Sequence, residues 1–418
     1  MPLLTPRDGF AGPLTDPIRA QQLAADLSAG SGPIALDAER SSGYRYSQRA
    51  YLVQLRREDV GTVLLDPIAL GDLEVLAAPF ADAEWVLHAA TQDMPCLAEI
   101  GLRPRALFDT ELAGRLAGLP RVGLGPLVEQ MLGLTLQKGH GADDWSTRPL
   151  PDSWLVYAAL DVEVLVELRD AMEALLLRQG KLEWARQEFA ALIAAPDPPP
   201  RIDPWRRTSG IHKVKDRRAL SVIRELWTER DLLARRRDLA PHRILPDPAI
   251  VDAAISKPTT VAALTSRPVF GGRTQRRHAD SWLDAITRGL AVPDRDLPPV
   301  HLPSDGPPTA GRWSDKDPVA YARLTAARTG LAELAQRVGM PVENLLTPDL
   351  MRRVLWQPPD PAELPDRLRA GGARPWQIEL TGPIIADALS AAVPAAAAVT
   401  APAASPTAVS TDGPAIED

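Results

Sequence analysis

Short apolar runs separated by polar or glycine-containing stretches dominate the start of the chain. Residues 33–38, 50–57 and 61–67 are compact segments rich in Val, Leu, Ile and Tyr. Runs of this length, bounded by turn-forming residues, are typical of β-strands. The pattern therefore predicts three successive strands.

Two further apolar runs follow, at 85–88 and 106–108, and they alternate with helical patterns such as 95–101 and 109–119. Strands that alternate with helices indicate a sheet covered by crossover helices. We therefore expect the first part of the chain to form an α/β domain.

The strand pattern ends at the proline run 198–200, which cannot continue a helix and reads as an exposed linker. Beyond it the periodicity is helical, and a second proline-rich boundary falls at about 293–311. From about residue 391 the chain consists of little but Ala, Pro, Ser and Thr, a composition too poor in large apolar groups to fold. The sequence predicts all-helical domains followed by a disordered tail.

The composition is that of an ordinary globular protein, with 418 residues, 45% hydrophobic and 24% charged. The one cysteine, Cys96, excludes an intramolecular disulfide and a cysteine-based structural zinc site. The sequence contains no apolar run of about 18 residues and no visible secretory signal. We therefore expect a cytoplasmic protein without membrane spans.

Charge is distributed unevenly along the chain. Residues 1–200 hold 17 basic and 28 acidic residues, a net charge of −11, whereas residues 201–290 hold 19 and 10, a net charge of +9. A basic segment after an acidic one suggests that the middle of the chain holds a polyanion. The alternative, an arginine-rich helical surface that only faces water, stays open.

Two carboxylates lie close together on the first predicted strand. Side chains alternate between the faces of a strand, so Asp37 and Glu39 point from the same face. Their mutual repulsion is relieved by a hard divalent cation such as Mg²⁺ or Mn²⁺. The alternative is a strand end whose acids face water.

A third carboxylate interrupts an apolar stripe on the predicted helix 151–180. The stripe consists of Tyr157, Asp161, Val164, Leu168 and Met172. Burying Asp161 is costly unless it is paired or binds a metal, whereas Glu163 and Glu167 fit a more solvated side. Tyr157 would place a phenol beside the same site, although a core aromatic with a satisfied hydroxyl is the alternative.

Asp93 supplies a fourth carboxylate, after the predicted strand 85–88 and before Met94-Pro95. An aspartate at this position often caps a helix, with proline in the first turn. The C-terminal end of a strand in an α/β layer is also where ligands are usually bound. Both interpretations stay open for Asp93.

Five segments of the sequence occur in a specific order and spacing: 34–39 with 51–55, 88–94, 109–110, 144–145 with 148–150, and 157–162. They resemble the exonuclease motifs of the ribonuclease D family, and the Tyr-x-x-x-Asp form of the last motif matches the DEDDy 3′–5′ exonucleases. The helical remainder is similar to helicase-and-RNase-D C-terminal (HRDC) domains. The resemblance implies an exonuclease domain at 15–195, an HRDC domain at 210–292, a second HRDC-like domain at 315–390 and a disordered tail at 391–418.

The resemblance implies an α/β ribonuclease H-like fold, followed by all-α HRDC-type domains, and hydrolysis of phosphodiesters with two divalent ions, Mg²⁺ or Mn²⁺. Asp37 would bridge both ions, Glu39 and Asp161 would complete the shell of one, and Asp93 would hold the other. Tyr157 would orient the attacking water.

The basic middle domain carries clusters that suit a phosphate backbone and give binding without sequence readout. These candidates are Lys213, Lys215, Arg217, Arg218, Arg235, Arg236, Arg237, Arg273, Arg276 and Arg277.

We therefore predict a metal-dependent 3′–5′ exoribonuclease that trims the 3′ ends of structured RNA. Its partner would be an RNA with a free 3′ end, such as a tRNA precursor, and the protein would act as a monomer. A DNA-directed exonuclease is one alternative. A non-catalytic RNA-binding protein on the same scaffold is another, against which the intact acids and Tyr157 argue.

Overall fold

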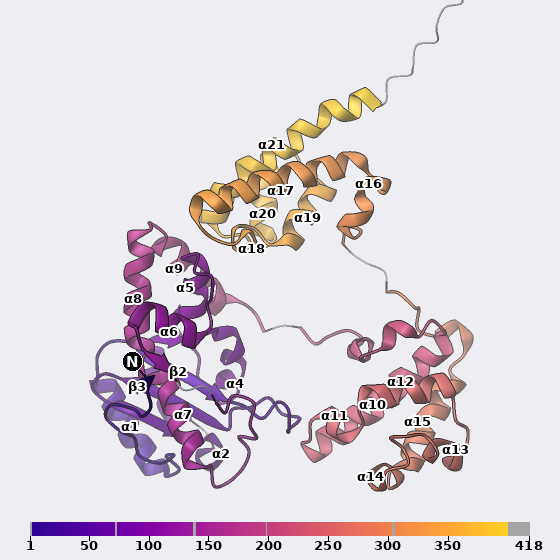
Figure 1. Cartoon of the computed structure of the whole chain (residues 1–418), viewed down its shortest axis with the longest axis horizontal. Coiled ribbons are helices and arrows are strands. Elements are labelled where there is room, and N and C mark those ends of the chain that lie inside the picture. Colours follow the sequence, from indigo (N-terminus) through magenta and orange to yellow (C-terminus); the bar gives the residue numbers. More distant parts are fainter. Residues whose placement is uncertain (1, 72, 137–138, 198, 303–305, 400–418) are drawn as a thin grey trace, which may run out of the picture. The chain divides into compact units, whose positions relative to one another are not determined.

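The computed structural model describes residues 2–71, 73–136, 139–197, 199–302 and 306–399. Contacts divide the chain into two compact units, Met1–Pro303 and Ser304–Asp418. The first unit combines an α/β domain with a helical domain, and the second is helical (Figure 1). The predicted order, an α/β domain followed by all-α domains, is confirmed.

A five-stranded mixed sheet forms the centre of the α/β domain. The strand order is β4-β3-β2-β5-β6, with β2 antiparallel to β3 and parallel to β5. All five predicted strands are present: β2 Ile34–Glu39, β3 Leu52–Arg57, β4 Gly61–Leu65, β5 Glu84–Leu87 and β6 Ala106–Asp109. Two short strands, β1 Pro2–Leu3 and β7 Thr135–Leu136, pair in parallel elsewhere. The strand that carries Asp37 and Glu39 is therefore the central one.

Helices cover the sheet and connect its parallel strands. The α/β domain contains α1 Pro17–Ala29, α2 Pro67–Leu70, α3 Glu74–Ala81, η1 Ala90–Gln92, α4 Met94–Glu99, α5 Thr110–Leu116, α6 Leu124–Leu132, α7 Asp152–Glu163, α8 Leu165–Arg178 and α9 Leu182–Ala194. Helix α7 contacts β2, β3 and β4, and α8 contacts β2 and β5. This packing lays α7, which carries Tyr157 and Asp161, against the central strand.

The predicted helix 151–180 is two helices, α7 and α8, because Val164 has a non-helical backbone (φ −113°, ψ 3°). Glu163, at the end of α7, is 3% exposed, so its expected place on a solvated side is wrong. Its carboxylate accepts a hydrogen bond from the Thr62 hydroxyl (3.2 Å) and lies 3.3 Å from the Arg56 guanidinium. These partners come from β3 and β4, so the buried acid anchors α7 on the sheet.

The helical domain of the first unit is built around the long helix α10. Its elements are η2 Pro204–Arg207, η3 Ile211–Lys213, α10 Arg217–Arg237, α11 Pro241–Ile244, α12 Asp247–Ser256, α13 Val261–Thr265, α14 Arg273–Arg276, α15 Ala279–Ala291 and η4 Asp294–Asp296. Helices α10 and α15 cross closely at Gly289, where an added Cβ would lie 2.6 Å from the Cα of Val222. Only glycine allows this approach without displacing backbone.

The second unit contains η5 Ala310–Arg312, α16 Trp313–Lys316, α17 Pro318–Val338, α18 Val342–Leu345, α19 Pro348–Trp356, η6 Pro361–Glu363, α20 Leu364–Ala370 and α21 Pro375–Val399. Helix α21 continues past residue 391, where we expected a disordered tail to begin; alanine, which has the highest helix propensity, occupies six of the nine positions 391–399. The rest of that predicted tail, 400–418, lies outside the described residues. In the part of the chain that the structure describes, no helix is long and apolar enough to cross a membrane.

Glu163 and Glu167 provide a matched test of this anchoring. Replacing Glu163 by alanine removes the buried one of the two carboxylates that pair with the Arg56 guanidinium, the other being the exposed Asp8. We expect a loss of about 3 kcal/mol in the free energy of unfolding. Glu167 pairs with Arg7 at the surface, with both side chains more than 40% exposed. Glu167→Ala should therefore cost about 1 kcal/mol or less. Urea unfolding of the two variants measures both values, and equal losses would contradict the anchoring role.

Candidate active site

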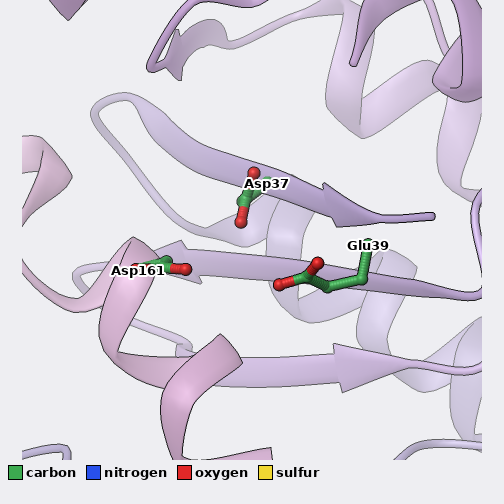
Figure 2. Close-up of side chains that lie close together, drawn as sticks. All are labelled: Asp37, Glu39 and Asp161. Atoms are coloured by element: carbon green, nitrogen blue, oxygen red, sulfur yellow. The ribbon is translucent and has the colours of Figure 1, made fainter. Parts of the chain in front are cut away.

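Three carboxylates from two elements meet above the central strand. Asp37 and Glu39 project from β2, and Asp161 projects from α7 (Figure 2). One oxygen of each lies within 4.8 Å of one oxygen of each of the others. The sequence prediction that these three acids share a site is consistent with this geometry, and the set is compatible with a divalent cation.

Asp93 lies at the junction of η1 and α4 and is 5% exposed. Among the described residues it makes no side-chain hydrogen bond to the helix start, so the capping interpretation lacks its defining contact. Its carboxylate instead lies 3.4 Å from the guanidinium of Arg40. Burial without a cap leaves the oxygens of Asp93 available to the acidic site.

Asp109, at the end of β6, fixes the turn that delivers Asp93. Its carboxylate accepts hydrogen bonds from the backbone N–H groups of Ala89 (3.1 Å) and Ala90 (2.9 Å) across the sheet. It also caps α5 by accepting from the N–H groups of Glu111 and Leu112. Ala89 adopts a left-handed backbone (φ 60°), and this network holds it there. Asp109 is thus a positioning residue for the segment that ends in Asp93.

Tyr157 precedes Asp161 by one helical turn, and its hydroxyl hydrogen-bonds the Asp161 carboxylate. The ring of His140 meets the Tyr157 ring edge to face, with centroids 5.8 Å apart. His140 is itself held by Asp143, 2.6 Å from its Nδ1, and its carbonyl accepts from the Trp145 indole (3.2 Å). The loop that contains these residues therefore fixes the orientation of Tyr157.

Burial and mutual repulsion dominate the electrostatics of the acids. Desolvation raises the pKa values of Asp37, Glu39, Asp93 and Asp161 above the ordinary carboxyl range, and the neighbouring carboxylates raise those of Glu39, Asp93 and Asp161 further. Arg40 opposes the shift at Asp37 and Asp93. Desolvation also raises the pKa of the Tyr157 phenol, with Asp161 adding to the effect. The single positive charge of Arg40 is too small to neutralise this cluster of four carboxyl groups.

The acids line a cleft of about 550 Å³ that is partly open to solvent. A cleft of this size is in the range of small-ligand sites. Arg40 and Arg121 contribute positive charge to its walls, and the N-terminal residues of α6 form another part of them. His88 also lines the cleft, but its Nδ1 is 2.9 Å from the Thr110 hydroxyl, and burial lowers its pKa to about 4. His88 is therefore neutral at physiological pH and already has a partner.

The predicted phosphate-binding residues divide into two groups. Arg217 and Arg218 bond the segment after α15 and the last turn of α15, through backbone carbonyls such as those of Pro298 (3.3 Å) and Leu290 (3.1 Å). The others are exposed: Lys213, Lys215, Arg235, Arg236, Arg237, Arg273, Arg276 and Arg277. Two arginine clusters that are distant in sequence, one with Arg236 and Arg237 and one with Arg277, both lie near His278. Besides burial, Arg237, Arg277 and Arg236 lower the pKa of this histidine.

Three known protein families match separate parts of this chain. Residues 13–177 match the family described as 3′–5′ exonuclease, 219–286 match the HRDC domain, and 306–389 match the 3′ to 5′ exonuclease C-terminal domain. The chain is 31% identical to ribonuclease D of Acidiphilium cryptum (strain JF-5) over 358 residues, 82% of this chain and 88% of that protein. It is 32% identical to ribonuclease D of Jannaschia sp. (strain CCS1) over 284 residues, 65% and 72% of the two chains.

The chain belongs to the ribonuclease D family. This membership confirms the predicted enzyme class, a 3′–5′ exoribonuclease and hence a hydrolase. The first domain is the exonuclease domain, with the predicted ribonuclease H-like arrangement of mixed sheet and helices, and the helical domain of the first unit is an HRDC domain.

Solved structures agree with this assignment. A protein from Bifidobacterium adolescentis superposes with a TM-score of 0.87 at 35% identity, over 93% of this chain and 99% of that one. Escherichia coli RNase D superposes with a TM-score of 0.66 at 24% identity, over 92% and 99%, and shows the same fold.

Sequence reasoning missed Arg40 and His140. Arg40 follows Glu39 directly, and a cation next to two predicted metal-site acids was a usable signal. His140 gave no comparable signal, because its contacts with Tyr157 and Asp143 depend on how the loop after β7 folds back.

The raised carboxyl pKa values predict how stability depends on pH. A carboxyl whose pKa is higher in the folded than in the unfolded state contributes stability below the unfolded value, and that contribution is lost as pH rises through the folded value. In EDTA, the free energy of unfolding should therefore fall between pH 5 and pH 8, by at least about 2 kcal/mol. Glu39→Gln should flatten this dependence, while Asp152→Asn, an exposed acid on α7, should leave it unchanged. A wild-type profile that rises over this interval would contradict the analysis.

Proposed function

We propose that this enzyme trims RNA 3′ ends by divalent-metal-dependent hydrolysis of the terminal phosphodiester bond. The observation that carries the proposal is the partly buried acidic cluster of Asp37, Glu39 and Asp161, whose oxygens lie within 4.8 Å of one another beside Tyr157. Such a cluster is costly in the folded protein unless cations neutralise it.

The donor set fits hard divalent cations. All four acids offer carboxylate oxygens, the ligands that Mg²⁺ and Mn²⁺ prefer. Cys96 is not among the described residues whose ligand atoms converge, and its thiol donates to the backbone carbonyl of Asp93 (3.1 Å). Asp37, Glu39 and Asp161 would hold one ion, and Asp37 with Asp93 would hold a second. Two such ions, when bound, would lower the pKa of the attacking water and stabilise the entering and leaving oxygens.

The protein's own side chains orient the attacking water and the substrate. Because burial and Asp161 raise its pKa, the Tyr157 phenol stays protonated at neutral pH and is no general base. It can donate or accept a hydrogen bond, and we assign it the positioning of the attacking water. Arg40, at the cleft wall, offers a cation to the substrate phosphate or to Asp93.

The relatives and the charge distribution support RNA as the substrate. Escherichia coli RNase D is described as an exoribonuclease involved in structured RNA processing. Here the basic residues that meet at His278, together with the exposed residues of the same domain, would bind the phosphates of the RNA body. The domain limits 15–195, 210–292 and 315–390, tRNA precursors as substrates, a monomeric state and a cytoplasmic location stay predictions.

The acids can be tested against an acid on the same helix. Asp37→Asn and Asp161→Asn should each lower turnover of a 5′-labelled RNA at least about 10³-fold, because a lost ligand removes metal-dependent stabilisation. Both variants should remain folded. Asp152→Asn, at the exposed start of α7, should be as active as the wild type. The same assay with the DNA analogue tests the alternative substrate: preferential cleavage of DNA would replace RNA in the proposal, and full activity of Asp37→Asn would contradict the metal site.

Tyr157→Phe separates water positioning from packing. The ring and its contact with His140 remain, and only the hydroxyl is lost. We expect kcat to fall about 10²-fold with KM for RNA little changed, since the hydroxyl acts on the attacking water. Steady-state kinetics measures the split, and a raised KM with unchanged kcat would assign the hydroxyl to substrate binding instead.

A further inference from the structure

The loop between β2 and β3, residues 40–51, leaves the cleft wall directly after Glu39 and is here called the docking loop. Its base is held within the exonuclease domain. The Ser146 N–H donates to the Ser41 hydroxyl (2.8 Å), and the Arg45 guanidinium donates to the Ser146 hydroxyl (2.7 Å). Arg40, its first residue, faces Asp93. One end of the loop is therefore part of the catalytic cleft.

The tip of the docking loop contacts the HRDC domain. The Tyr46 hydroxyl donates to Asp231 (3.1 Å), and the Ala240 N–H donates to the Tyr44 carbonyl (2.9 Å). The Tyr46 ring packs against the hydrophobic core of the HRDC domain. The guanidinium of Arg243 stacks 4.3 Å from the Tyr44 ring centroid. Apolar packing, hydrogen bonds and cation–π contacts thus meet at a few residues.

Asp238 is the most connected acceptor of this interface. It ends α10 with a left-handed backbone (φ 46°). Its carboxylate accepts from the Ser47 N–H (2.9 Å) and the Tyr51 hydroxyl (3.4 Å), and the Arg49 guanidinium lies 3.8 Å away. The hydrogen bonds from Ser47 and the charge of Arg49 lower its pKa despite partial burial, so it is ionised at neutral pH.

The same end of α10 carries the predicted phosphate-binding arginines. Arg235 belongs to the interface, because its guanidinium lies 5.5 Å from the Tyr46 ring centroid and 3.5 Å from Asp231. Arg236 and Arg237 act on His278 instead. The contact with the docking loop and the basic cluster thus occupy adjacent residues of α10. We therefore expect Arg235 to hold the HRDC domain against the docking loop, and no longer to bind phosphate.

We propose that the docking loop fixes the HRDC domain to the rim of the catalytic cleft, so that RNA bound by the basic cluster presents its 3′ end to the acids, and that Asp238 is the positioning residue of this contact. The proposal rests on the proposed function and adds a determinant of specificity. A short single strand needs only the cleft. An RNA with a duplex body binds more tightly when the HRDC domain is held in a fixed position beside the cleft.

Asp238→Gly in the full chain tests the proposal, because glycine keeps the left-handed backbone while the carboxylate is lost. Lys257→Gly is the matched control. Lys257 also ends a helix of this domain with a left-handed backbone (φ 49°), but it pairs with Asp216 inside the domain. Asp238→Asn should rescue most of the effect, since its amide oxygen still accepts from Ser47 and asparagine tolerates this backbone. Tyr46→Phe should act in the same direction as Asp238→Gly, but more weakly.

Two measurements are needed, and the first uses no RNA. Hydrogen exchange of docking-loop amides, Ser47 included, should become about tenfold faster in Asp238→Gly and stay unchanged in Lys257→Gly. For a hairpin RNA with a single-stranded 3′ end, KM should rise about tenfold in Asp238→Gly. For a short single-stranded RNA, kcat and KM should stay unchanged.

Each alternative outcome is informative. Unchanged exchange in Asp238→Gly would overturn the docking contact. Faster exchange with an unchanged KM for the hairpin, or an equal loss on both RNAs, would overturn its role in specificity. If the wild type cleaves neither RNA, the proposed function fails, while the exchange result still decides whether the contact exists.

Discussion

The repulsion between carboxylates at the partly buried acidic site is the constraint on which the rest of this structure depends. Asp37, Glu39 and Asp161 are brought within 4.8 Å of one another, in a place where desolvation already raises their pKa values. The fold opposes this cost with packing around the site: α7 lies across three strands, and Glu163 anchors its end. We propose that divalent cations, for which carboxylate oxygens are preferred ligands, offset the cost of holding this cluster together.

The surrounding residues orient this cluster. Asp109 accepts from two backbone N–H groups of the turn before Asp93 and from two at the start of α5, and the His140 loop holds the Tyr157 ring. Arg40 connects the acids to the docking loop and, through it, to the HRDC domain. The docking loop thus connects the repelling carboxylates of the active site to the position of the HRDC domain. This connection allows an acidic catalytic domain and a basic helical domain to act on the same polyanion.

Much of the fold and of the acidic site could be predicted from the sequence, because both depend on local periodicity. The strand alternation placed Asp37 and Glu39 on one face, and the helical stripe placed Asp161 beside Tyr157. Features that depend on distant partners were not predictable: the break at Val164, the burial of Glu163 against β3 and β4, and the contact between Arg235 and Tyr46. The continuation of α21 to Val399 was not predicted. The low content of large apolar residues indicated disorder, and this was given more weight than the high helix propensity of alanine.

The central claim is that the acidic cluster exists to bind divalent cations, and direct Mn²⁺ binding to the full chain tests it most simply. Electron paramagnetic resonance of a Mn²⁺ titration should show two ions per wild-type chain, with the spin coupling of ions that share a ligand. Asp37→Asn should lose that coupling and at least one ion, because Asp37 is the ligand assigned to both. Two Mn²⁺ bound with unchanged affinity and coupling in Asp37→Asn would contradict the account.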